Sequence, residues 1–331
     1  MKIISKETGV QKFYIYRGQP LIVKQNSLSY NNSVFNIADN ESYYVENNVF
    51  TKHVEECDYV FINNEFHKVN KEYNDIYFFS DASWIEFSRE NNTYYARLVE
   101  GEYYYNLILN DSKNYECRWL HNDILVFNQV LRNFLLFYAK TGEKLWEYKT
   151  ENSDWKINRM CIPMVDNVVV IISTSNPTSN YRIRIEGFNI HTGERLWINN
   201  HKNITNHYFI GPDKMLYTCQ HDWLDMKNDI MQLVLYKLNP FTGETETTQL
   251  KVDDDSGVVC PWNTCIYGNK LYYADNHPGC ILGVVDIDKK QIVEEFSLNL
   301  KKGFRMGAPI VTEDKIYQFI RNKKEVWVFD K

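Results

Sequence analysis

The sequence has little of several features that would point to particular classes of protein. Its 331 residues include only 14 glycines, and no glycine-rich phosphate-binding motif follows a strand-like run. No apolar run approaches the 18 residues that a membrane-spanning helix requires. The formal net charge is −6, so the excess of basic residues that binds phosphate backbones is missing. We therefore expect neither a nucleic-acid partner nor a membrane partner.

Export signals and disulfide patterns are also missing. Residues 1–7 lack the apolar core of a signal peptide. The seven cysteines are an odd number scattered along the chain, which favours reduced thiols over a disulfide framework. These two observations predict a cytoplasmic protein that is a monomer when unbound.

What the sequence does contain is an internal repeat. The tripeptide Thr-Gly-Glu occurs around Gly142, Gly193 and Gly243, and these glycines are 51 and 50 residues apart. A tryptophan follows the first two glycines, at Trp146 and Trp197. A constant period near fifty residues indicates a repeat architecture.

Each repeat has the composition of a β-hairpin. Short runs rich in Phe, Tyr, Leu and Ile flank a polar turn, as in residues 135–139 before Gly142. Glycine suits the turn because it adopts positive φ without steric cost. The tryptophan that closes the hairpin is large enough to fill the space between neighbouring sheets. The repeats therefore predict an all-β protein built from consecutive sheets.

The Thr-Gly-x-x-x-Trp pattern resembles the repeat of the quinoprotein (PQQ-like) β-propellers. Residues 308–317 and 161–170 are similar to the opening strand, tight turn and second strand of the same family, and the resemblance covers about residues 119–331. It implies four-stranded antiparallel blades in a single domain over residues 1–331.

The number of blades follows from aligning weaker repeats by their turns. Candidate turns at residues 39–41, 89–92 and 286–290 extend the period and give six hairpins. Residues 326–331 and 7–16 supply the two halves of a seventh. The expected fold is thus a seven-bladed propeller whose terminal strands share one blade, with six or eight blades as alternatives. This sharing closes the ring, so that no sheet edge is left unpaired.

The resemblance also raises the possibility of quinone chemistry. The dehydrogenases of that family use a calcium ion, an aspartate base and a disulfide between adjacent cysteines. This sequence has no adjacent cysteine pair and no residues that match the ligand set. We therefore expect a non-catalytic member without PQQ.

One cluster has the composition of a zinc site. Cys260, Cys265, His277 and Cys280 lie within one repeat, and three cysteines with a histidine suit tetrahedral zinc. Cys265 is an odd number of residues from Cys260, so on a continuous strand it faces the other way. The predicted zinc ligands are therefore Cys260, His277 and Cys280, and the alternative is a set of plain thiols with a turn histidine.

Large or cationic residues precede the expected first strand of several blades. If the repeats align, they surround one mouth of the central channel, and Arg and Trp are enriched in binding hot spots. The alternative is that they pair with nearby carboxylates. The predicted rim consists of Arg118, Trp119, Arg159, His207, Trp262 and Arg305.

These observations favour a protein-interaction module over an enzyme, because the rim offers few candidate bases. One specific form is a bacterial immunity protein that neutralises a toxin. The alternative is a small-ligand-binding or hydrolytic propeller with its site at the channel mouth.

Overall fold

The computed structural model describes most of the chain. The residues that it leaves undescribed are 32, 47–48, 56, 63–64, 69–74, 81–82, 91–92, 101–102, 110–114, 130–133, 152–153, 159–160, 176–181, 201–204, 226–229, 252–258, 276–278 and 301–303.

The N-terminal half forms four antiparallel sheets of four strands, each in chain order. Sheet B contains β2 (Lys12–Tyr16), β3 (Gln19–Val23), β4 (Ser27–Tyr30) and β5 (Ser33–Asn36). Sheet C contains β6 (Glu41–Glu46), β7 (Val49–Val54), β8 (Cys57–Ile62) and β9 (Glu65–Lys68). Sheet D contains β10 (Asp75–Ser80), β11 (Ser83–Glu90), β12 (Thr93–Glu100) and β13 (Tyr103–Leu109). Sheet E contains β14 (Tyr115–His121), β15 (Ile124–Gln129), β16 (Phe134–Ala139) and β17 (Lys144–Lys149).

Four further sheets follow, and the first strand of sheet F is split in two. Sheet F contains β18 (Trp155–Ile157), β19 (Met164–Val165), β20 (Val168–Ser175), β21 (Arg182–Asn189) and β22 (Arg195–Asn199). Sheet G contains β23 (Phe209–Ile210), β24 (Leu216–Asp225), β25 (Ile230–Leu238) and β26 (Thr245–Gln249). Sheet H contains β27 (Val259–Tyr267), β28 (Lys270–Asp275), β29 (Gly279–Asp286) and β30 (Gln291–Leu300). Sheet A contains β31 (Ile310–Val311), β32 (Lys315–Ile320), β33 (Glu325–Asp330) and β1 (Lys2–Glu7), with the short 3₁₀ helix η1 (Arg321–Lys323) between β32 and β33.

These consecutive antiparallel sheets are the blades of a β-propeller. The predicted all-β class, the four-stranded antiparallel blades and the sharing of one blade by both ends are confirmed. The described strands form eight sheets, one more than the seven predicted from the repeat spacing.

The extra sheet arises because the N-terminal repeats are shorter than the period of fifty. The third strands of sheets B to E begin at Ser27, Cys57, Thr93 and Phe134, which are 30, 36 and 41 residues apart. From sheet E to sheet H the same spacing is 48, 48 and 49 residues. As a result, the predicted turn at 89–92, of which residues 91–92 are not described, falls between the second and third strands of sheet D, and the one at 39–41 falls between sheets B and C.

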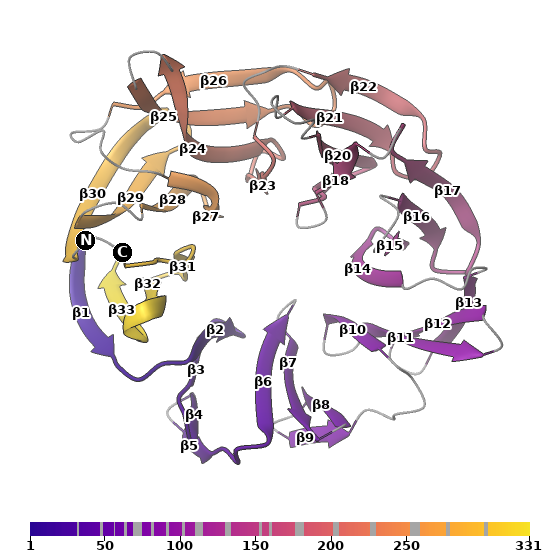
Figure 1. Ribbon diagram of the computed structural model, residues 1–331, viewed down its shortest axis with the longest axis horizontal. Helices are drawn as coiled ribbons and strands as arrows, with labels where there is room; N and C mark the ends of the chain where they lie inside the picture. The colour runs from indigo at the N-terminus through magenta and orange to yellow at the C-terminus, as the bar shows by residue number, and fades with distance from the viewer. Residues whose placement is uncertain are drawn as a thin grey trace. The chain divides into compact units, whose positions relative to one another are not determined.

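The shared blade is closed by a different segment from the one predicted. β1 pairs antiparallel with β33, so that Lys2 lies opposite Asp330 and Glu7 opposite Val326, and Figure 1 shows the two chain ends close together. Residues 10–16, which were expected to form this outer strand, instead lead into β2 of sheet B. The Val10 amide still binds the Lys324 carbonyl at 2.8 Å, which holds the connecting segment against sheet A.

The contacts between Cα atoms divide the chain into two compact units. Unit 1 comprises Met1–Phe13, Met160–Gly187 and Arg195–Lys331. Unit 2 comprises Tyr14–Arg159 and Phe188–Glu194. The single domain over residues 1–331 stays a prediction.

In both units the apolar cores lie between neighbouring sheets. In unit 1, Ile172 of sheet F packs in one cluster with Tyr236 of sheet G, while Leu235 of sheet G shares another with Leu271 of sheet H. In unit 2, Tyr16 and Phe50 join sheets B and C. These pairs of sheets therefore stabilise one another by burying their apolar faces together. Among the described residues, no helix is long and apolar enough to span a membrane.

Candidate functional site

The predicted rim residues fall in both units and are described separately. In unit 2, Arg118 and Trp119 lie in β14, and the Arg118 side chain is outside the described part of the chain. Arg159 is also outside it. In unit 1, His207 precedes β23, Trp262 lies within β27 and Arg305 precedes β31. Because β27 contacts both β23 and β31, the unit 1 residues belong to neighbouring first strands.

Trp262 is exposed because the backbone of β27 bulges. Val259 lies opposite Asp275 and Thr264 opposite Tyr273, so four residues of β27 face a single residue of β28. The Thr264 hydroxyl donates to the Pro261 carbonyl at 2.7 Å and fixes the bulge. Bulges redirect side chains, and the Trp262 side chain is 59% exposed whereas its neighbour Asn263 is 5% exposed.

The neighbouring first strand β23 and the residues before it offer an exposed apolar side chain and a neutral histidine. Ile210 in β23 is 47% exposed, and the His207 ring lies 4.9 Å from the Phe209 ring. Burial lowers the pKa of His207, which keeps its imidazole neutral at pH 7. We call His207, Ile210 and Trp262 the Trp262 surface. It offers an aromatic anchor with an apolar neighbour, which is the composition of a binding hot spot.

The predicted zinc ligands lie partly outside the described residues. Cys260 is in the β27 bulge, Cys280 in β29 is buried, and His277 is not described. Burial and the nearby Asp275 carboxylate raise the pKa of both thiols. Among the described residues no three His, Cys, Asp or Glu side chains converge on one point. Zinc at this position stays a prediction.

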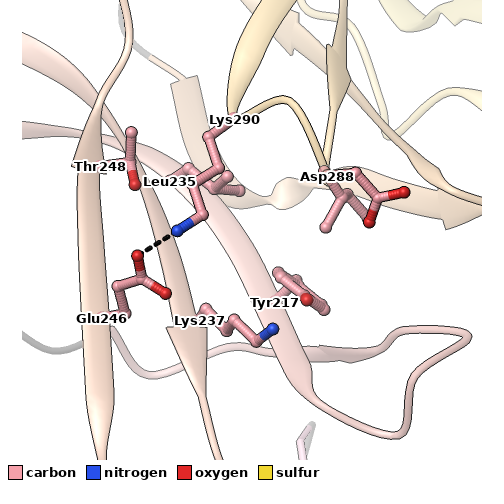
Figure 2. A pocket seen from close by; sticks show the side chains of 8 residues that line it. Tyr217, Leu235, Lys237, Glu246, Thr248, Asp288 and Lys290 are labelled. Carbon is pink, nitrogen blue, oxygen red and sulfur yellow. Dashed lines mark hydrogen bonds and ion pairs between the residues drawn. The ribbon is translucent and has the colours of Figure 1, made fainter.

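A second feature was missed by the sequence analysis. A depression of about 140 Å³ lies between sheets G and H, and Figure 2 shows the side chains around it. It is lined by Tyr217, Leu235, Lys237, Glu246, Thr248, Ile287, Asp288 and Lys290.

The depression corresponds to the position that a tryptophan fills in the two preceding sheets. The Trp146 indole N–H donates to the Ile190 carbonyl at 2.7 Å, and the Trp197 indole N–H donates to the Pro240 carbonyl at 2.8 Å. Both rings thus reach the third turn of the next sheet. The residue four positions after Gly243 is Thr247, so sheet G lacks the indole.

The strand register of sheet G explains which side chains take the place of the indole. In sheet E the pairing shifts by one residue, so that Phe137 lies opposite Trp146 and their rings stack at 3.8 Å. In sheet G no shift occurs, and Lys237 lies opposite Glu246. Glu246 forms an ion pair with Lys290 in the turn of sheet H, which Figure 2 marks with a dashed line.

Both lysines that line this depression form ion pairs. Asp213 accepts hydrogen bonds from Tyr217 at 2.8 Å and from Lys237 at 3.2 Å. Burial opposes ionisation of Asp213, but these bonds outweigh it and hold its pKa below the ordinary value. Burial and the bond to Asp213 raise the pKa of Tyr217 to about 12. The Lys290–Glu246 pair therefore bridges sheets G and H, whereas the Lys237–Asp213 pair lies within sheet G.

Comparison with known proteins identifies a fold but no family. No family model and no curated protein matches the sequence. Among solved structures, the dihydro-heme d1 dehydrogenase NirN in complex with DHE matches with a TM-score of 0.53 and 10% identity, over 87% of this chain and 66% of that one. BamB from Moraxella catarrhalis matches with a TM-score of 0.42 and 12% identity over 100% and 97% of the two chains. Raptor from Chaetomium thermophilum matches with a TM-score of 0.49 and 9% identity over 99% and 29%. At these identities the likeness to NirN supports the propeller fold alone.

Proposed function

We propose that this β-propeller is a protein-interaction module that engages its partner through the Trp262 surface. The observation that carries the proposal is the exposure of Trp262 at 59% on a bulge held by the Thr264–Pro261 hydrogen bond. A rigid anchor loses little conformational entropy on binding, and tryptophan is the residue type most enriched in interface hot spots.

The propeller fold also supports a binding role. Each blade is an antiparallel sheet packed against its neighbours, so loops and bulges at the blade ends are held on a rigid scaffold. A cytoplasmic toxin-neutralising protein is one narrower form of this proposal. A toxin gene next to the gene of this protein, with a product that binds the chain, would support that form.

The test is native mass spectrometry of the protein purified gently from its own cells. We expect an additional protein of defined mass in stoichiometric complex with the wild type, and we expect Trp262→Ala to lose it. The matched control is Phe241→Ala, because Phe241 is 39% exposed but lies in the turn between β25 and β26. A partner retained by Trp262→Ala would overturn the role of this surface. A small-molecule adduct in place of a protein would favour the ligand-binding alternative.

A further inference from the structure

Two loops at one end of sheet A bring four cationic side chains together. Residues 304–307 precede β31, and residues 321–324 connect β32 to β33. We call them the cationic loops. Their cations are Arg305, Arg321, Lys323 and Lys324, and all except the half-exposed Lys323 are exposed.

Hydrogen bonds fix the two loops against each other. The Arg321 amide donates to the Arg305 carbonyl at 2.9 Å, and the Arg305 amide donates to the Asn322 side-chain oxygen at 2.8 Å. The Lys324 amide then closes the turn by donating to the Arg321 carbonyl at 3.1 Å. Arg305 and Arg321 are sixteen residues apart in sequence. Hydrogen bonds from the backbone amides of both residues hold them side by side.

These cations differ from others in the described part of the chain. Lys214 pairs with Asp166 at 2.8 Å, and Lys52 pairs with Glu41 at 2.6 Å. Within the same described part, no carboxylate lies at ion-pair distance from any cation of the two loops. Lys323 instead lies 5.0 Å from the centre of the Phe304 ring. On a protein of net charge −6, the cationic loops therefore carry positive charge that no carboxylate of the described residues pairs with.

The cationic loops belong to the sheet next to the one that carries Trp262. β31, which follows the first loop, contacts β27, which carries Trp262. In an antiparallel sheet, the loop before the first strand and the turn between the second and third strands lie at the same end. A partner seated on Trp262 would therefore meet these cations.

We propose that the cationic loops bind an acidic segment of the partner protein, a proposal that rests on the function proposed above. Arginine guanidinium groups form bidentate hydrogen bonds with carboxylates, and Arg305 and Arg321 present two of them from a fixed backbone. The ammonium groups of Lys323 and Lys324 add non-directional attraction. Opposite charge at this site also steers a partner toward an otherwise negative protein.

The test uses a fluorescein-labelled octaglutamate peptide and measures its anisotropy against the full-length protein. We expect saturable binding at 50 mM NaCl that weakens at least tenfold at 300 mM, because screening acts on exposed charges. The variant R305E/R321E is expected to bind at least tenfold more weakly. The charge-matched control K144E/K289E changes the net charge equally but alters cations outside the loops, and it should bind within about twofold of the wild type.

Three further measurements test whether the cationic loops bind an acidic segment. R305K/R321K keeps the charge and should retain part of the binding, and the thermal melting of each variant shows whether it is folded. No saturable binding by the wild type, or equal binding by a folded R305E/R321E, would overturn the proposal. Tighter binding of a DNA duplex of matched charge would assign the site to nucleic acid instead. If the peptide fails to bind but the cellular partner still depends on Trp262, only the role of the cationic loops is rejected. If the peptide binds but no partner that depends on Trp262 is found, the proposed function is rejected instead.

Discussion

At the scale of single residues, two close packing contacts pair a tryptophan with a glycine in the turn of the next sheet. A Cβ atom at Gly243 would lie 2.5 Å from the Trp197 ring, and one at Gly193 would lie 2.6 Å from the Trp146 ring. Both glycines also have positive φ, at 78° and 71°. Glycine is required at these turns by the indole above it as well as by the backbone conformation.

A double-mutant cycle between Trp197 and Gly243 tests this coupling. We expect Trp197→Ala to lower the free energy of unfolding by about 3 kcal/mol, because it removes a large packed ring and its hydrogen bond. Gly243→Ala should cost more than about 1 kcal/mol, the cost of left-handed φ alone, because its Cβ meets the indole. In the Trp197→Ala background, Gly243→Ala should lower the free energy of unfolding by less than it does in the wild type. The effects of the two substitutions should therefore be less than additive.

Urea unfolding of the four proteins measures the cycle. Strictly additive losses would show that the ring and the turn do not interact. A Trp197→Ala variant as stable as the wild type would contradict the role of the indole altogether.

The buried Cys161 and the half-buried Cys265 provide a second prediction at this scale. Burial raises the pKa of Cys161 to about 11 and that of Cys265 to about 12. Because only the thiolate reacts, we expect both cysteines of the native protein to resist iodoacetamide at pH 8. The rate should rise about tenfold per pH unit while the pH stays below these pKa values. Mass spectrometry of labelled peptides measures the rates, with the guanidinium-unfolded protein as control, and native labelling at the unfolded rate would contradict the burial.

At the scale of elements, sheet G differs from sheets E and F in how it meets its neighbour. Where sheet E meets sheet F, and sheet F meets sheet G, an indole packs on the turn glycine of the next sheet. Where sheet G meets sheet H, the Glu246–Lys290 ion pair takes the place of this contact, and both side chains are partly exposed. Lys290 occupies the turn with φ 53°, where sheets E, F and G have glycine. Thr247 of sheet G stands where the two preceding sheets have the tryptophan, so a side chain is tolerated at this turn.

Alanine substitutions at this boundary should therefore be mild. We expect Lys290→Ala and Glu246→Ala each to cost less than about 1 kcal/mol, since exposed ion pairs contribute about 0.2–1 kcal/mol. The double variant should cost no more than either single one, because both remove the same interaction. Thermal melting measures these changes, and a loss as large as that of Gly243→Ala would show that the boundary is more tightly packed than the depression indicates.

At the scale of the whole molecule, the pairing of β1 with β33 decides whether the last blade is complete. β1 covers one edge of β33, and without it the backbone groups along that edge would be unpaired. Trp327 of β33 also lies 3.5 Å from the Lys6 ammonium of β1. The first seven residues are thus part of the fold.

Deleting residues 1–7 should lower the melting temperature and promote aggregation through the exposed edge of β33. Adding a synthetic peptide of residues 1–7 should restore part of the stability by re-forming the missing strand. Calorimetry measures both effects. An unchanged melting temperature after the deletion would contradict the closure, and two separate transitions in the full-length protein would show that the two compact units unfold independently.

The sequence predicted the molecule best where the repeats are most regular. The hairpins around Gly142, Gly193 and Gly243 are confirmed because turn chemistry and flanking apolar runs are local signals. The sequence of sheets B to D lacks the Thr-Gly-Glu tripeptide, and the third strands of sheets B to E begin only 30 to 41 residues apart. A fixed period of fifty therefore yields one sheet too few.

Local chemistry in the sequence thus determined the all-β class and the shared terminal blade, and the resemblance to the PQQ-like propellers implied the four-stranded antiparallel blades. Tertiary structure alone decided the features on which the proposals rest. The exposure of Trp262 depends on a register shift between β27 and β28, and a shift is set by packing against neighbouring strands. Arg305 and Arg321 meet because backbone hydrogen bonds join two loops that are distant in sequence. The alternation of side chains along one strand specifies the face of the sheet on which each residue lies. Only contacts between strands and between sheets specify which residues pack against that face.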